Sequence, residues 1–510
     1  MSNLGINLKT ICVLLGALIL MVFGCSRSDN FSLSEVKKLV DDGYLAKASK
    51  TINERLKHDP QNREVLLLRA KLRERSDDLE LALEDYNQIL ESDPDSIEAK
   101  EARGKLKIRL KDYDGALQDL NWVLQAGIKD ERLLSSLGLA YFFKRDFKKA
   151  RKLFDESQNI NEKYEGAYFG RAAIDIEEKD YQAAIQELDT LLRFHPKNAQ
   201  ALFRRGFAYL KASDSQKALD DFNKALELDP DLEEIYWYRA ETNRVLGLPE
   251  KALKDYEKAE AADPNDPILY LNQGTVLMGL GRYSEALEKL TRSIVLDPEN
   301  PLPFINRAVL QFDTGNLLAS LSDLNKAIAL RGDDPQLLIR RAYIFKLMAR
   351  GDRAIADLDM ALANDPNNHQ ALLLRGSLYY NESQLERAIQ DLNEAISQTP
   401  EAPSPYELLA EALLRKRDNK GALAQAELAL KKDSSYVPAY ITTGDIQISD
   451  LNYDQAVEAY SRALSIDNNN FEARIKRAKL YFELKDFPEA IDDLDYAARV
   501  NPYSGEVYAL

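Results

Sequence analysis

The sequence has very little cysteine and histidine for its length. Of its 510 residues, two are cysteine (Cys12 and Cys25) and three are histidine (His58, His195 and His369). Both cysteines lie in the first 25 residues, so the remainder of the chain cannot form a disulfide or a cysteine-ligated metal site. No second histidine accompanies any of the three, and we interpret them as solvated turn residues. The chain must be stable by packing alone.

The sequence also lacks an excess of positive charge and the motifs of common enzymes. It has 68 lysines and arginines against 84 aspartates and glutamates, which leaves a net charge of −16. Such a surface repels phosphate groups, so we expect no nucleic acid as a partner. No phosphate-binding loop and no nucleophile elbow are present. We therefore predict a protein that is not an enzyme, with no catalytic residues, no cofactor and no metal ion.

The first 24 residues differ from the rest of the chain. One lysine, Lys9, precedes an apolar run of 14 residues at 11–24. This run is too short to span a bilayer and is typical of a signal-peptide core. Residues 22–25, with the sequence VFGC, resemble the lipobox of bacterial lipoproteins.

The lipobox resemblance implies how the N-terminus is processed. Residues 1–24 would be removed as a signal peptide, Cys25 would be lipidated, and residues 25–31 would form a short tether to the bilayer. The implied location is the bacterial cell envelope, with the outer membrane facing the periplasm favoured. The alternatives are a plain signal anchor or a chance apolar start.

Proline marks a period of 34 residues in the remainder of the chain. Nine prolines are separated by multiples of this period, at positions 60, 94, 196, 230, 264, 298, 366, 400 and 502. Divided from Asp29, the chain gives 14 consecutive repeats that end at Ser504 without an insertion or deletion. Self-similarity at a fixed period indicates stacked supersecondary units rather than separate domains.

Small residues recur at two places in the repeat. Position 20 is alanine in 13 of 14 repeats, with Ser320 as the exception, and position 8 is glycine or alanine in 13, with Val36 as the exception. Small side chains let two helices approach where a larger one would overpack by about 1–3 kcal/mol. Each repeat is therefore predicted to be two helices that cross near positions 8 and 20.

This pattern resembles the tetratricopeptide repeat family. The resemblance covers Asp29 to Ser504 and implies an all-α fold, a right-handed superhelical solenoid of 14 tandem 34-residue helix-turn-helix repeats. The first helices of such repeats line a concave groove, and residues 505–510 would be the truncated start of a further helix. The residues that match the family most fully are Leu137, Gly138, Tyr141, Ala150 and Phe154 in the fourth repeat, and Gly206, Tyr209, Ala218, Phe222 and Pro230 in the sixth.

A charged pair also recurs at a fixed spacing. Nine repeats have arginine at position 7, and the same nine have an acidic residue at position 23. None of the other five repeats has an acidic residue there. We predict a bidentate bridge between the two helices of each such repeat, with a structural role. The pairs include Arg205 with Asp221, Arg239 with Asp255, and Arg341 with Asp357.

The family resemblance also implies which positions face the groove. Positions 2, 5, 6, 9, 12 and 13 would lie on the concave side, where this chain has apolar and aromatic side chains with a few hydrogen-bond donors. Such a surface suits an extended peptide or an amphipathic helix. Packing between repeats is the alternative role for each residue. The residues assigned to the partner-binding groove are Phe169, Phe203, Arg204, Phe207, Trp237, Tyr238, Asn272, Asn306, Arg340 and Tyr343.

One specific function of the family can be tested against the sequence. Its co-chaperone members bind a C-terminal carboxylate through lysine at position 5 and asparagine at position 9, among other residues. No repeat of this chain has lysine at position 5 or asparagine at position 9. Recognition of a chaperone C-terminus is therefore disfavoured.

These observations predict a lipid-anchored scaffold that binds peptide or helical segments of partner proteins and assists assembly or organisation of an envelope complex. A cytoplasmic adaptor is the alternative if the N-terminal signal is unused. A self-assembling structural lipoprotein is a second alternative, because an exposed apolar end of such an array can stack on a copy of itself. The identity of the partner is not encoded in a recognisable way.

Overall fold

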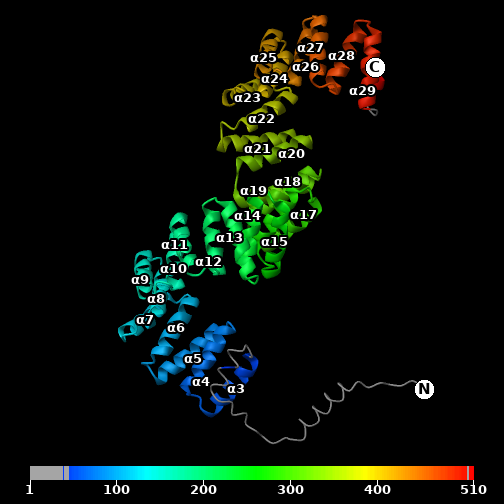
Figure 1. Ribbon diagram of the computed structural model, residues 1–510. Coiled ribbons are helices and arrows are strands. Elements are labelled where there is room, and N and C mark those ends of the chain that lie inside the picture. Colours follow the sequence, from blue (N-terminus) through cyan, green and yellow to red (C-terminus); the bar gives the residue numbers. More distant parts are fainter. Residues whose placement is uncertain (1–37, 39–44, 502–504, 510) are drawn as a thin grey trace, which may run out of the picture. The chain divides into compact units, whose positions relative to one another are not determined.

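The computed structural model describes residues 38, 45–501 and 505–509, and these ranges contain helices and turns but no strand. The signal peptide, Cys25 and the tether lie outside the described residues. The chain divides into two compact halves, residues 1–255 and 256–510, which we treat separately. Within each half, consecutive helices pack as hairpins that follow one another in chain order (Figure 1). The predicted all-α solenoid of helical hairpins is confirmed.

In the N-terminal half, each first helix of a hairpin is followed after a short turn by a second helix. The helices are α3 (Leu45–His58), α4 (Arg63–Arg75), α5 (Leu79–Ser92), α6 (Ile97–Arg109), α7 (Tyr113–Gln125), α8 (Glu131–Phe143), α9 (Phe147–Ile160), α10 (Glu165–Glu177), α11 (Tyr181–Phe194), α12 (Ala199–Lys211), α13 (Ser215–Leu228), α14 (Glu234–Val245) and the start of α15 (Pro249–Ala262).

The C-terminal half continues the same alternation. No helix within the described ranges is long and apolar enough to cross a membrane. The helices are α16 (Pro267–Gly279), α17 (Tyr283–Leu296), α18 (Pro301–Asp313), α19 (Leu317–Arg331), α20 (Pro335–Leu347), α21 (Gly351–Asn364), α22 (His369–Asn381), α23 (Leu385–Gln398), α24 (Pro403–Arg415), α25 (Asn419–Lys432), α26 (Val437–Ser449), α27 (Tyr453–Ile466), α28 (Phe471–Glu483), α29 (Phe487–Val500) and the short α30 (Gly505–Ala509).

The turn inside each hairpin depends on one left-handed residue at position 15. Ser213, with φ of 65°, is a representative of the thirteen described repeats. Its amide donates to the Leu210 carbonyl, and the Asp214 amide donates to the Tyr209 carbonyl, so the first helix ends in a Schellman motif. The Asp214 side chain then accepts a hydrogen bond from the Lys217 amide and caps the second helix. One short segment thus stops one helix and starts the next.

The two helices of a hairpin approach closely where small residues were predicted. A Cβ atom added to Gly206 would lie 2.7 Å from the ring of Phe222, and Ala218 is fully buried on the facing helix. Ser320, which replaces the usual alanine, donates its hydroxyl to the Ala308 carbonyl at 2.7 Å. The hydroxyl is therefore satisfied, which removes the penalty for burying it.

The structure brings the predicted charge pairs together in all nine repeats. Arg205 binds Asp221 through two parallel hydrogen bonds of 2.7 Å, from Nε to Oδ2 and from Nη2 to Oδ1. Asp221 is 3% exposed, and its charge is neutralised inside the protein. The nine pairs are Arg69–Asp85, Arg103–Asp119, Arg171–Glu187, Arg205–Asp221, Arg239–Asp255, Arg307–Asp323, Arg341–Asp357, Arg375–Asp391 and Arg477–Asp493.

Within the described residues, eight of these nine arginines, all except Arg69, also contact the preceding hairpin, which the sequence analysis did not foresee. The Nη1 atom of Arg205 donates to Asp189 at 2.6 Å, and that of Arg239 donates to Asn223 at 2.9 Å. In both cases the acceptor is at position 25 of the repeat before. Each of these eight guanidiniums therefore joins the two helices of its own hairpin and binds that hairpin to its neighbour.

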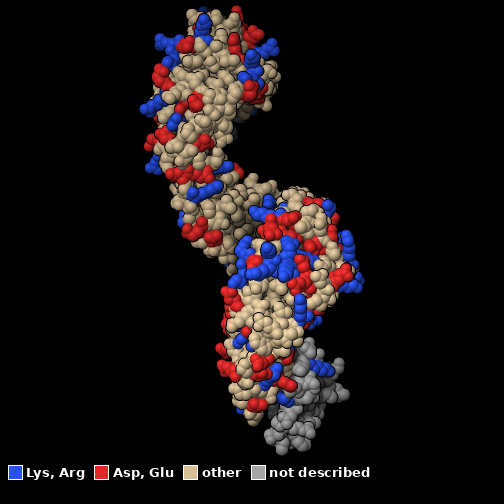
Figure 2. All heavy atoms as spheres, turned by 90° about the vertical axis from the view of Figure 1, so that its left-hand side faces the viewer, with Lys and Arg blue, Asp and Glu red and all other residues tan. Residues whose placement is uncertain are grey.

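Acidic and basic side chains are otherwise interspersed over the surface. Figure 2 shows both signs of charge across the visible face, alternating with areas that carry neither. Many form exposed pairs, for example Arg282 with Glu285 and Lys217 with Asp214. Such exposed pairs contribute about 0–1 kcal/mol each to stability.

We predict that Asp221→Ala lowers the free energy of unfolding by about 3 kcal/mol, because it leaves a partly buried guanidinium with only its exposed second partner. Asp189→Ala removes that second partner, whose side chain is 38% exposed, and should cost about 1 kcal/mol or less. Urea denaturation followed by circular dichroism measures both. Additive effects of Asp221→Ala and Arg205→Ala in a double-mutant cycle would contradict the bridge.

Candidate partner-binding groove

The first helices of successive repeats lie next to one another and form one face of each half. In the N-terminal half α8 contacts α6 and α10, and α12 contacts α14. In the C-terminal half α16 contacts α18, α20 contacts α22, and α24 contacts both α22 and α26. The residues assigned to the groove all belong to these first helices. We call this surface the first-helix face.

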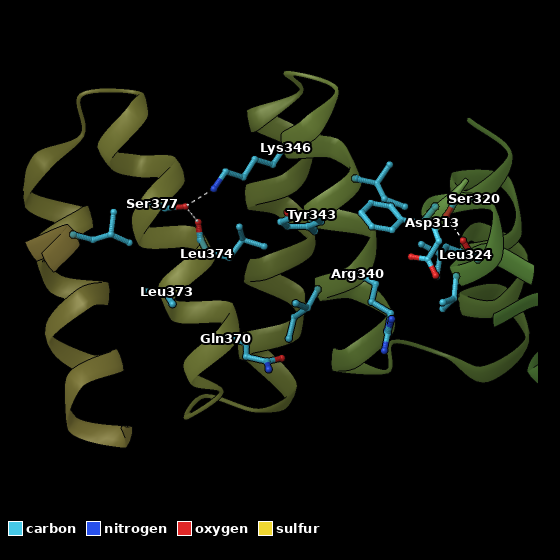
Figure 3. Close-up of a pocket in the computed structure, with 16 residues that line it drawn as sticks. Asp313, Ser320, Leu324, Arg340, Tyr343, Lys346, Gln370, Leu373, Leu374 and Ser377 are labelled. Carbon is cyan, nitrogen blue, oxygen red and sulfur yellow. Dashed lines mark hydrogen bonds between the residues drawn. The ribbon is translucent and has the colours of Figure 1, made fainter. Parts of the chain in front are cut away.

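The first-helix face of the C-terminal half contains a cavity of about 540 Å³. Arg340 and Tyr343, two residues assigned to the groove from the sequence, both line it and project from α20 (Figure 3). Tyr343 is 44% exposed, and its ring lies 5.9 Å from the ring of Phe312. The rest of the wall is mainly apolar and includes Val309, Phe312, Ile339, Leu373, Leu374 and Leu408.

Charged groups lie at the border of this cavity. Lys346 is directed from α20 toward α22, where its ammonium donates to the Ser377 hydroxyl at 3.1 Å (Figure 3). Burial lowers the pKa of Lys346. Arg340 is exposed and forms no ion pair or hydrogen bond with any residue that the structure describes. Asp313 on α18 is the acidic residue of the lining.

The N-terminal half has a cluster of aromatic rings on its first-helix face. The ring of Tyr238 lies 5.2 Å from that of Phe207 and 5.1 Å from that of Trp237, both nearly edge to face. Phe203 was assigned to the groove, but it lies in the hydrophobic core, where it is only 8% exposed and packs on Phe222. Position 5 thus serves the packing between helices here, as the alternative interpretation held.

Arg204 lies beside this aromatic cluster. Its guanidinium carbon is 5.1 Å from the centre of the Phe169 ring, within the range of a cation–π contact. Burial lowers the pKa of Arg204, opposed only by the charge of Glu234. Arg204 and Phe169 come from neighbouring repeats, so the first-helix face assembles the contact.

The two asparagines assigned to the groove already have partners. Asn306 donates its side-chain amide to the Thr275 hydroxyl at 3.0 Å. Asn272 also interacts within the chain. The Asn306 amide therefore joins α18 to α16, and a partner protein would have to displace this contact to use it.

Sequence analysis missed an acidic cluster on α24, α26 and α28. Thr442 donates to Glu407, which is 6% exposed, at 2.8 Å. Burial, reinforced by the charge of Glu411, raises the pKa of Glu407 to about 7. Lys476 bridges the other two acids of the cluster, Asp445 and Glu472. The signal was present at position 5, which holds Glu407 where most repeats have an apolar residue.

The described residues contain no group of three or more histidine, cysteine, aspartate or glutamate side chains that could hold a metal ion. His195 lies in a turn, where its Nε2 atom is 2.9 Å from the Lys163 carbonyl oxygen. His58 and His369 are exposed. None of these histidines faces the cavity or the aromatic cluster.

Models of the tetratricopeptide repeat match several parts of the chain and together cover half of it. One matches residues 199–232 and another residues 64–96. A third matches residues 239–301, 271–335 and 348–404, and a TPR repeat model matches residues 444–485. The matches include α12 and α18, whereas residues 233–238, with Trp237 and Tyr238, and residues 336–347, with Arg340 and Tyr343, lie between the matched ranges.

Several solved structures are similar to this chain. The APC/C hetero-tetramer Cut9–Hcn1 is 16% identical, with 96% of each chain covered and a TM-score of 0.39. Yeast Tom70 is 20% identical, with 80% of this chain and 93% of that chain covered and a TM-score of 0.38. A tetratricopeptide repeat protein from Parabacteroides merdae is 20% identical, with 49% and 98% covered and a TM-score of 0.40. No curated protein matches the chain.

The raised pKa of Glu407 predicts that stability falls as the pH rises from about 4.5 to about 7. Over this range the folded protein keeps a proton on Glu407 that the unfolded chain releases, so the stabilisation is complete at low pH and lost near neutrality. Glu407→Gln should therefore raise the free energy of unfolding by about 3 kcal/mol at about pH 8 and change it little at about pH 4.

Urea denaturation at the two pH values checks this prediction. Part of the wild-type decline should remain in the variant, because burial also raises the pKa of Glu411. An equal change in stability at both pH values would show that the Glu407 carboxyl is not titrating in this range.

Proposed function

This chain belongs to the tetratricopeptide repeat family, and from that premise we propose that it is an interaction scaffold. It binds peptide or helical segments of partner proteins on its first-helix face. The scaffold is anchored in the bacterial cell envelope and assists assembly or organisation of an envelope complex. Its role is binding rather than catalysis.

The observation that carries this proposal is the cavity on the first-helix face of the C-terminal half. Its volume of about 540 Å³ is sufficient for one or two large apolar side chains, and falls in the range of about 300–1,000 Å³ typical of binding pockets. Tyr343 stands 44% exposed at this cavity. An exposed aromatic residue beside an apolar hollow is the usual composition of an energetically important contact.

The charges around the cavity support a protein segment as the occupant. Arg340 and Lys346 are six residues apart on α20, which places them about 9 Å apart along the helix axis. Neither forms an ion pair with a described residue, so both can bind acceptors on a partner. An amphipathic helix or extended peptide brings apolar anchors and flanking acceptors together in one segment.

The envelope anchor is a separate part of the proposal. Residues 1–24 and Cys25 lie outside the described residues, and the support comes from the apolar run and the lipobox resemblance. A lipidated Cys25 would hold the array close to the bilayer, with the outer membrane facing the periplasm favoured. A cytoplasmic adaptor remains the alternative if the signal is unused.

Self-association is a second candidate, and the last hairpin supplies an observation in its favour. Phe482 on α28 is 52% exposed, and Phe487 and Ile491 on α29 are 48% and 56% exposed. The corresponding side chain at position 12 of other repeats, such as Phe312, is more buried. Contiguous exposed apolar groups of this kind favour association with another protein surface, including a second copy of this chain.

We predict that replacing Arg340 and Tyr343 together by alanine removes the partner set that the wild-type protein captures. Affinity capture from its own cells after brief crosslinking, followed by mass spectrometry, measures this. The loss is expected because the double variant removes the exposed aromatic group and the free cation at the cavity.

A matched control is available in the same half. Arg282 and Tyr283 are adjacent residues at the start of α17. Tyr283 is also 44% exposed, and neither residue lines the cavity. Replacing both by alanine should leave the partner set unchanged. Equal loss in both variants would move binding away from the cavity, and capture of only this chain would make self-association the leading function.

We predict that Cys25→Ser releases the protein from the membrane fraction and abolishes its labelling by a radioactive fatty acid. The reason is that a serine hydroxyl cannot form the thioether by which such proteins are lipidated. Fractionation and labelling of cells that express each form make the comparison. Unprocessed wild-type protein in the soluble cytoplasmic fraction would contradict the anchor and favour the adaptor.

A further inference from the structure

Arg204 differs from the other partly buried arginines of the first helices. The shielded Nε atom of Arg204 has no hydrogen-bond partner, and no nitrogen of its guanidinium forms an ion pair with any described residue. The adjacent Arg205 binds Asp221 and Asp189, and those bonds raise its pKa, whereas burial lowers the pKa of Arg204. Arg204 and Arg205 are adjacent on α12, but Arg205 is paired with two carboxylates and Arg204 is paired with none that the structure describes.

An unpaired, partly buried charge is unfavourable for a folded protein. Desolvation of a guanidinium costs free energy that only a hydrogen-bonded partner offsets. Glu234 is the one acidic group whose charge acts noticeably on Arg204, but it is exposed and no ion pair joins them. The structure therefore holds Arg204 ready for an acceptor that the described part of the chain does not provide.

A second donor without a partner lies on α14, the next first helix along the chain. The indole Nε1 atom of Trp237 on α14 is also shielded from solvent and has no acceptor. Trp237 follows Glu234 by three residues, so both lie on the side of α14 whose charge acts on Arg204. Arginine and tryptophan side chains can donate hydrogen bonds but cannot accept them. The missing group must therefore be an acceptor, and beside a guanidinium a carboxylate is the strongest one.

The surroundings of these donors suit a side chain embedded in an apolar segment. The guanidinium of Arg204 lies over the Phe169 ring. Phe207 follows Arg204 by three residues on α12, which places both on one side of that helix, and its ring packs edge to face on Tyr238 of α14. The first-helix face continues from α10 to α8, because these two first helices are in contact. A polypeptide can therefore run along the face through this point.

We propose that Arg204 and Trp237 bind the side-chain carboxylate of an aspartate or glutamate in an extended partner segment that also carries apolar residues. This inference rests on the scaffold function proposed above, because it names the chemistry of a segment bound on the first-helix face. It adds a site in the N-terminal half, separate from the cavity in the C-terminal half.

The test uses random dodecapeptides displayed on phage and selected on the purified full-length protein. Wild-type protein should select peptides in which an acidic residue adjoins apolar residues. Synthetic copies should bind Arg204→Gln at least about thirtyfold more weakly, the usual effect of removing one member of a buried charge pair. They should bind Arg282→Gln, a matched variant at an exposed arginine that lines neither the cavity nor the aromatic cluster, as tightly as wild type.

The outcomes separate this inference from the scaffold function. A selection in which no peptide requires an acidic residue, or in which none loses affinity for Arg204→Gln, would overturn the carboxylate site and leave the scaffold intact. Peptides that need only a free C-terminal carboxylate would overturn the side-chain assignment. Failure to select any peptide would overturn the scaffold and this site together.

A stability measurement distinguishes a binding role of Arg204 from a structural one. Arg204→Met should raise the urea midpoint, because it replaces an unpaired desolvated charge by an apolar side chain of similar length. Arg205→Met should lower the midpoint, because it leaves Asp221 buried without its partner. A lower midpoint in both variants would show that Arg204 stabilises the fold and would overturn the proposal.

Discussion

In nine of the fourteen repeats the hairpin is held by the bridge between the arginine at position 7 and the carboxylate at position 23. In Arg205 a single guanidinium binds both oxygens of Asp221 and, through its third nitrogen, Asp189 of the preceding hairpin. It therefore sets the crossing of two helices and the stacking of two repeats together. A buried carboxylate without its arginine is strongly destabilising. This explains why every repeat that has the arginine also has the acidic residue, and why no repeat has only one of them.

Repeats without this arginine show how the same space is filled in other ways. Leu137 and Leu153 occupy the two positions in the fourth repeat and are apolar. In the eighth repeat Lys289 binds Glu260 of the preceding hairpin, which reverses the polarity of the contact. The described side chains at this crossing are therefore either uncharged, or charged and paired with an opposite charge. The arginine bridge is the most frequent of these arrangements.

Because the bridges neutralise most buried charge, the chemistry of the first-helix face comes from the remaining positions. Aromatic rings with Arg204 mark the N-terminal half, and an apolar cavity bordered by Arg340 and Lys346 lies on α20. An acidic cluster that includes the buried Glu407 lies on α24, α26 and α28. A regular scaffold can therefore present several different contact chemistries. This combination suits a protein that holds more than one segment of its partners.

The sequence by itself determined the repeat length, the helical hairpin and the pairing of Arg205 with Asp221, because each follows from a pattern repeated many times. It could not assign individual groove residues: Phe203 became core, Asn306 bonded to Thr275, and Arg340 and Tyr343 met at a cavity. These outcomes, like the isolation of Arg204 and the burial of Glu407, depend on side chains of neighbouring repeats. Only the tertiary structure decided them, because burial and hydrogen-bond satisfaction are properties of packed surfaces rather than of positions along a chain.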